Sequence, residues 1–89
     1  MTEEPWRLVV APGAVRALDR LPGKHAAAVL EALQAIAENP RRLGKPLQAE
    51  LAGLWSARRG PYRILYALDG ERRRVDVVRI GHRADVYRR

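Results

Sequence analysis

The segment that decides the fold reads LWSARRGPYRILYALDGERRRVDVVRI and spans residues 54–80. It contains three short runs with β-branched or aromatic residues, at Leu54–Arg59, Tyr62–Leu68 and Arg74–Ile80. Gly60-Pro61 separates the first two runs and Asp69-Gly70 the last two. Gly, Pro and Asp are preferred in turns, and Asp-Gly between two such runs is typical of a hairpin. The segment therefore predicts three consecutive antiparallel strands.

Strict alternation along these strands assigns each side chain to one of two faces. Ser56 and Arg58 share a face of the first strand. On the second strand one face holds Tyr62, Ile64, Tyr66 and Leu68, and the other holds Arg63, Leu65, Ala67 and Asp69. On the third, alternation groups Val75 and Val77 with Arg79, opposite Asp76, Val78 and Ile80. If helices cover one side of this sheet, the other face or its rim is free to display arginines.

Two helices are predicted upstream of the sheet, from Pro12 to about Arg20 and from about Lys24 to Glu38. Leu21-Pro22-Gly23 breaks the chain between them, so they form an antiparallel hairpin. The second helix has its apolar residues at helical spacing, at Ala26, Val29, Leu30, Leu33, Ile36 and Ala37. A short β-favouring run, Trp6–Val10, precedes both helices.

The remaining segments carry weaker patterns. Residues 41–53 predict an irregular connection with a turn at Gly44-Lys45-Pro46, and Val86-Tyr87 are candidates for a final strand. The expected fold is α+β: an N-terminal strand, an antiparallel helical hairpin, and a three- to four-stranded antiparallel sheet. Because 89 residues are too few for a second core, we expect one domain over residues 1–89.

The composition excludes several classes of protein. Cys is absent, which excludes disulfide scaffolds, thiolate metal sites and Cys nucleophiles, and two His leave little for a metal site. Hydrophobic residues make up 47% of the chain, which is typical of a globular protein. No apolar run reaches membrane-spanning length, and Glu3 and Glu4 stand where a signal peptide would be basic. We expect a cytoplasmic protein that does not contact membranes.

The positive charge is concentrated in the second half of the chain. The formal net charge is +7, and all basic residues except Lys24 and Lys45 are arginines. Residues 1–53 hold seven basic and six acidic groups, whereas residues 54–89 hold ten arginines and four acidic groups. A GC-rich coding sequence would also favour arginine, but it does not explain this uneven distribution. The planar guanidinium suits phosphate oxygens, so an anionic polymer such as a nucleic acid is the favoured partner.

The common catalytic motifs are absent: there is no GxSxG, HExxH or P-loop. His25 is expected to be a surface residue of the second helix. The residues left for chemistry are basic or aromatic: Arg58, Arg59, Arg63, Arg79, His82, Arg83 and Tyr87. They suit RNA cleavage by the ribose 2′-hydroxyl, because arginines can stabilise the phosphorane without a metal and His or Tyr can move protons. A sheet edge with solvated arginines, or backbone binding without cleavage, stays open as an alternative.

Three stretches resemble the RelE/ParE toxin superfamily, and its RelE branch more than its ParE branch. They are Lys45-Pro46-Leu47, the run from Leu51 to Tyr66 with its Gly-x-Tyr-Arg, and the ending Val78–Arg89 with its Gly-His-Arg and later Tyr. The resemblance covers essentially the whole chain. It implies the RelE-like microbial RNase fold and the toxin of a bacterial type II toxin–antitoxin pair. It further implies cleavage of mRNA in the ribosomal A site, with no metal and no cofactor.

The resemblance also implies roles for single residues. Arg63 and Arg83 match arginines that stabilise the phosphate, and Tyr87 matches a tyrosine that stacks on or orients the scissile nucleotide. Two positions that are often basic in the family hold Ser56 and Arg58, of which Arg58 is counted as catalytic. The general base stays open among Arg58, His82 and Tyr87. Contacts with RNA are expected from Lys45, Ser56, Arg59, Arg79 and His82.

The partners implied by the resemblance are mRNA, the ribosome and an acidic, RelB-like antitoxin that wraps the toxin in a heterotetramer or larger complex. The alternative function is that of a ParE-like toxin, which inhibits DNA gyrase by binding and is not an enzyme. The presence of Arg63, Arg83 and Tyr87 together favours the enzyme. A third alternative is an RNA-binding member whose toxicity has decayed.

Overall fold

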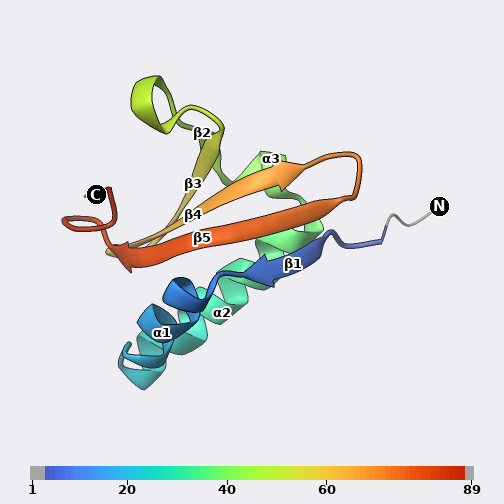
Figure 1. Ribbon diagram of the computed structural model, residues 1–89. Helices are drawn as coiled ribbons and strands as arrows, with labels where there is room; N and C mark the ends of the chain where they lie inside the picture. The colour runs from blue at the N-terminus through green and yellow to red at the C-terminus, as the bar shows by residue number, and fades with distance from the viewer. Residues whose placement is uncertain (1–3, 88–89) are drawn as a thin grey trace.

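The computed structural model describes residues 4–87 and arranges them around one five-stranded sheet of order β1-β5-β4-β3-β2. The strands are β1 (Arg7–Val10), β2 (Lys45–Pro46), β3 (Leu54–Arg59), β4 (Tyr62–Asp69) and β5 (Arg74–His82). The helices are α1 (Pro12–Asp19), α2 (Gly23–Glu38), the short α3 (Pro40–Leu43) and the 3₁₀ turn η1 (Ala49–Leu51). Figure 1 shows α1 and α2 on one face of the sheet. We call the face away from them the open face.

The α+β class, the helical hairpin and the antiparallel run β3-β4-β5 are confirmed. Pro12 occupies the first turn of α1, where its missing N–H costs nothing. The apolar stripe of α2 buries Val29, Leu33 and Ile36 against the sheet. No helix within residues 4–87 is long and apolar enough to cross a membrane.

The sequence left the pairing of the N-terminal strand β1 unassigned, and the structure supplies it. This strand pairs with β5 in parallel, from Arg7 opposite Arg74 to Val10 opposite Val77. A parallel pair needs a long crossover, which the helical hairpin and the following segments supply. The sheet is therefore mixed, and β1 forms one of its edges.

Two local expectations are wrong. Lys45-Pro46, predicted as a turn, is the edge strand β2, with Lys45 opposite Ser56 and Pro46 opposite Trp55. An edge strand tolerates proline because one side of its backbone needs no partner. Val86-Tyr87 does not form a strand, because residues 83–87 turn back from the end of β5 and bury Val86.

A β-bulge overturns the predicted faces of β5. Leu65 lies opposite Arg79, while its neighbour Tyr66 lies opposite Val77, so Val78 is the extra residue. The bulge reverses the alternation: Val77 and Ile80 both enter the core, and Arg79 moves to the open face with Leu65. The prediction that Arg79 shares a face with Val75 and Val77 is therefore wrong.

The core lies between the helices and the sheet. Its buried members are Trp6, Ala14, Val29, Leu33, Ile36, Ala57, Ile64, Tyr66, Val75, Val77 and Ile80. Tyr66 is the polar member, and its hydroxyl donates a 2.6 Å hydrogen bond to the carbonyl of Pro40. Burial raises the pKa of Tyr66 to about 12, although a hydrogen bond with the Gly44 backbone opposes this rise. The hydroxyl ties α3 and the start of β2 to the centre of the sheet.

Candidate functional site

A cavity of about 320 Å³ opens on the side of the sheet where β2, β3 and β4 meet the C-terminal turn. We call it the cationic cavity. It is lined by Leu43, Lys45, Leu47, Ser56, Arg58, Arg63 and Tyr87. Five of these seven residues are predicted site residues: Lys45, Ser56, Arg58, Arg63 and Tyr87. The structure thus brings together residues from β2, β3, β4 and the chain's end.

The pairing of the strands explains why these side chains meet. Lys45 lies opposite Ser56, and Arg58 lies opposite Arg63. Like charges placed directly opposite across two strands repel each other, so this pair costs stability. Among residues 4–87, the cavity lining includes no carboxylate that would neutralise them. The three cations give the cavity a positive potential, which favours an anion.

Arg63 is held in place by the turn that precedes its strand. Its Nη1 donates to the carbonyl of Gly60 at 3.1 Å and to the carbonyl of Tyr62 at 3.0 Å. The turn itself requires a glycine, since Gly60 has a φ of +56°. A guanidinium has five N–H donors, so the others remain for a ligand. Arg63 therefore enters the cavity with its orientation already fixed.

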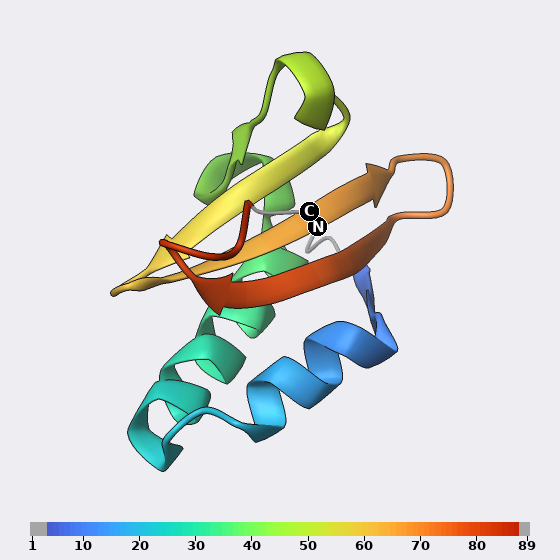
Figure 2. The ribbon, with the colours of Figure 1, turned by 60° about the vertical axis from the view of Figure 1, so that its left-hand side comes forward.

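Tyr87 reaches the cavity because the C-terminal turn folds back over the open face, as Figure 2 shows. Val86 is 2% exposed and packs on Gly81, where a Cβ would meet Val86 at 3.6 Å. Arg79 Nη1 donates to the Val86 carbonyl at 2.9 Å. The Tyr87 hydroxyl and Ser56 Oγ form a 2.9 Å hydrogen bond. Tyr87 is 42% exposed, so its side chain is accessible for stacking on a ligand.

Arg83 lies at the same end of the sheet but is not among the residues that line the cavity. Its backbone N–H donates to the Pro61 carbonyl at 2.8 Å, which fixes the start of the C-terminal turn beside the β3–β4 turn. Its side chain is exposed. Gly81 pairs with Arg63 in the sheet, and Arg83 follows Gly81 by two residues.

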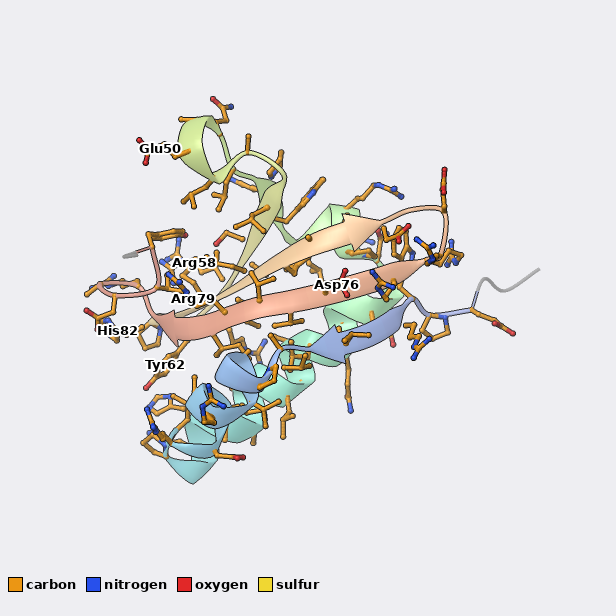
Figure 3. The ribbon with its side chains drawn as sticks, viewed as in Figure 1. Glu50, Arg58, Tyr62, Asp76, Arg79 and His82 are labelled. Carbon is orange, nitrogen blue, oxygen red and sulfur yellow. The ribbon has the colours of Figure 1, made fainter. Side chains whose placement is uncertain are left out.

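Two other predicted residues lie on the helix side of the sheet. Arg59 forms a 3.2 Å ion pair with Glu31 of α2. His82 lies opposite Tyr62 in the sheet, with ring centroids 6.0 Å apart, and Tyr62 contacts His25 of α2 at 5.2 Å. Figure 3 shows His82 and Tyr62 together at this end of β5. Neither Arg59 nor His82 lines the cationic cavity.

The apolar wall of the cationic cavity was not predicted from the sequence. Leu43 and Leu47 supply it, and both lie in the segment predicted to be irregular. This wall is held against the sheet at Gly44, which packs so closely on Tyr66 that a Cβ there would overlap the Tyr66 hydroxyl. The glycine before Lys45 hints at a close approach, but a glycine does not specify which side chain approaches it.

The arrangement can bind a phosphate and stabilise negative charge that develops on it. The groups lining the cavity that can exchange protons are the hydroxyls of Ser56 and Tyr87 and the ammonium of Lys45. Within residues 4–87, no three His, Cys, Asp or Glu side chains gather as a metal site.

Comparison with known proteins gives matches along nearly the whole chain. The family described as the ParE toxin of the type II toxin–antitoxin system parDE matches residues 8–87. Toxin RelG of Mycobacterium tuberculosis is 48% identical over 86 residues, covering 96% of this chain and 99% of that toxin. Toxin RelE of the same organism is 45% identical over 87 residues, covering 97% of this chain and 90% of that toxin.

A solved structure agrees with these matches. The toxin–antitoxin complex RelBE2 of Mycobacterium tuberculosis contains a chain that is 45% identical, with a TM-score of 0.84. The match covers 91% of this chain and 94% of that chain.

Proposed function

We propose that this chain, which belongs to the ParE toxin family of type II toxin–antitoxin systems and is a RelE-like toxin, is an endoribonuclease. Its substrate would be mRNA in the ribosomal A site. The observation that carries the proposal is the cationic cavity, where Lys45, Arg58 and Arg63 surround the hydrogen-bonded pair Ser56 and Tyr87. This set of side chains fits a nucleotide with its phosphate among the cations.

The reaction is an attack of the ribose 2′-oxygen on the adjacent phosphorus. The new bond forms a 2′,3′-cyclic phosphate as the bond to the 5′-oxygen breaks, and a proton moves from the 2′-hydroxyl to the departing 5′-oxygen. The pentavalent intermediate carries more negative charge on its oxygens than the substrate does. Lys45, Arg58 and Arg63 would stabilise this charge, and Arg83 would contact the phosphate from the neighbouring turn. Tyr87 would stack on the nucleotide, since its ring is partly exposed.

The cationic cavity lacks a histidine for proton transfer among the lining residues that the structure describes. Histidine is the side chain that exchanges protons most readily near neutral pH, and His82 lies away from the cavity on the helix side of the sheet. The chain therefore relies on orientation of the 2′-hydroxyl, which can contribute roughly 7–11 kcal/mol when it is imposed in advance. A ribosomal A site would impose that geometry on mRNA.

The test compares one transcript in two states, naked and bound to programmed ribosomes, with the same purified toxin. We expect strong cleavage of the ribosome-bound transcript and little cleavage of the naked one. Equal rates in the two reactions would show that the chain holds its own acid–base pair. No cleavage in either reaction would remove the endoribonuclease proposal.

An antitoxin partner follows from the family, and the similar solved structure is itself a toxin–antitoxin complex. We propose an acidic antitoxin whose carboxylates shield the cationic cavity, in a heterotetramer or larger assembly. A permanent complex of this kind buries on the order of 2,000 Å² or more. The toxin would act in the cytoplasm, where ribosomes translate. Toxin that expresses freely without an antitoxin and harms nothing would contradict this partner.

A second candidate function is inhibition of DNA gyrase by binding. The observation that favours it is the description of the matching family as a ParE toxin, although both similar Mycobacterium tuberculosis proteins carry RelE-type names. A supercoiling assay with purified gyrase separates the two candidates. We expect no inhibition at toxin concentrations that cleave ribosome-bound mRNA.

A further inference from the structure

A second, smaller hollow lies beside the cationic cavity on the open face, with a volume of about 140 Å³. Its apolar lining comes from five elements: Leu51 of η1, Leu54 of β3, Leu65 of β4, Val78 at the bulge of β5, and Val86 of the C-terminal turn. Tyr87 lines both the hollow and the cationic cavity. One aromatic ring therefore separates a site for negative charge from a site for an apolar group.

We propose that the apolar hollow is a nucleobase subsite, which takes the base next to the scissile phosphate while the cationic cavity holds that phosphate. This inference rests on the proposed endoribonuclease function and adds a determinant of sequence preference to it. Because one water occupies roughly 30 Å³ in the liquid, a hollow of about 140 Å³ has room for a ring and not merely for solvent.

Charge complementarity selects a nucleotide over a purely apolar partner. A nucleotide joins an anionic phosphate to a base with apolar faces, and the two cavities present cations and apolar walls side by side. Arg79 lines the hollow, and its guanidinium is hydrogen-bonded to the Val86 carbonyl. The hollow therefore has a fixed cation at its edge, suited to the polar edge of a base.

The β-bulge builds this subsite. Because Val78 is inserted opposite the junction of Leu65 and Tyr66, both Val78 and Arg79 face the hollow, and Val78 stays 41% exposed. A regular strand would present only one of the two residues to the open face. Val78 is thus the residue whose side chain can be changed to fill or alter the hollow without entering the core.

The experiment measures binding of two short RNA probes that carry a 2′-O-methyl group at the cleavable linkage. One probe has 2-aminopurine beside that linkage, and the other has an abasic residue there with the same charge. We expect the wild-type toxin to bind the base-containing probe about tenfold more tightly than the abasic probe, as expected for one stacked base, with quenched fluorescence. Val78→Trp, which fills the hollow, should bind both probes equally.

The matched control is Val15→Trp on α1, a valine of 41% exposure in the helix layer. It should keep the tenfold preference. Val78→Ser is a second variant for the case that the large ring disturbs β5, and it should reduce the preference without filling the hollow. Circular dichroism would confirm that each variant is folded.

The outcomes separate this inference from the proposed function. Toxin that cleaves ribosome-bound mRNA but binds both probes equally would overturn the subsite and leave the function intact. Toxin that prefers the base-containing probe but cleaves nothing would support the subsite and overturn the function. If Val78→Trp keeps the base preference and loses only affinity for an antitoxin peptide, the hollow is a polypeptide site and the inference is overturned.

Discussion

Arg63 and Arg83 show how differently two arginines of similar expected role are held. The guanidinium of Arg63 is fixed by the carbonyls of Gly60 and Tyr62 inside the cationic cavity. Arg83 donates its backbone N–H to the Pro61 carbonyl, and its side chain is exposed. Removing the Arg83 side chain therefore leaves the backbone hydrogen bond to Pro61 in place.

Arg83→Ala should abolish growth arrest without unfolding the protein. Loss of one cation at the developing phosphate charge should lower the cleavage rate on the order of 10²–10³-fold, roughly 3–4 kcal/mol. The measurement is the cleavage rate on ribosome-bound mRNA together with the thermal unfolding curve. Full toxicity of a stably expressed Arg83→Ala variant would remove Arg83 from the proposed mechanism.

Tyr66 supports a prediction about pH. In the folded protein its pKa is about 12, whereas an unfolded tyrosine titrates near 10. Between these values the folded state keeps a proton that the unfolded state has lost, so stability is complete below pH 10 and falls as the pH rises toward 12. Unfolding in urea should show a loss on the order of 1 kcal/mol from pH 9 to pH 11.

Tyr66→Phe is the variant that checks this assignment. It should be less stable at neutral pH by about 1–3 kcal/mol, because the buried Pro40 carbonyl loses its donor. It should also lose the alkaline decline described for the wild type. An unchanged decline in the variant would assign the titration to another group.

At the scale of elements, β2 is placed by a close approach rather than by a turn conformation. Gly44 has an ordinary φ of −102°, but a Cβ there would overlap the Tyr66 hydroxyl and lie 2.9 Å from its Cζ. The glycine is needed for space. Any side chain at this position would push Lys45 and Leu43 away from the sheet.

Gly44→Ala should therefore destabilise the protein by about 1–3 kcal/mol, as expected for an overpacked core. Gly23→Ala is the matched control, because nothing lies within 4 Å of a Cβ at the first residue of α2. It should be stabilising by about 0.4–1 kcal/mol. Thermal unfolding resolves both, since 1 kcal/mol moves the Tm by roughly 4–8 °C. Equal Tm values for the two variants would contradict the close packing at Gly44.

The elements also show what the sequence can predict. Apolar spacing along α2 and the Gly60-Pro61 and Asp69-Gly70 turns were enough for the helical hairpin and for β3-β4-β5, because these contacts are local. The parallel pairing of β1 with β5 joins residues about 67 positions apart, such as Arg7 and Arg74. No local pattern specifies such a pair.

The candidate site was predictable in part for the same reason. Ser56, Arg58 and Arg63 were predicted as site residues, and the two-residue turn between β3 and β4 fixes the register that brings them together. The face of β5 on which Arg79 lies was predicted wrongly. A bulge adds one residue to β5, and no residue type in the sequence predicts that bulge. His82 follows the reversed alternation and lies opposite Tyr62 on the helix side.

At the scale of the whole molecule, the two faces of the sheet differ in what they carry. The helices cover one face of the sheet and bury the core there, while the open face carries the cationic cavity and the apolar hollow. The excess of arginine in residues 54–89 contributes to this division, since Arg58, Arg63 and Arg79 line the two cavities. We propose that this open face cleaves RNA.

RNA cleavage by the open face is tested by measuring the cleavage of ribosome-bound mRNA by wild-type toxin, Arg63→Ala and Arg16→Ala, with the new ends identified chemically. Arg16 is an exposed arginine of α1 and has the same charge as Arg63. We predict 2′,3′-cyclic phosphate and 5′-hydroxyl ends, full activity of Arg16→Ala, and a loss on the order of 10²–10³-fold for Arg63→Ala. Cleavage by Arg63→Ala at the wild-type rate, or no cleavage by the wild type, would contradict the claim.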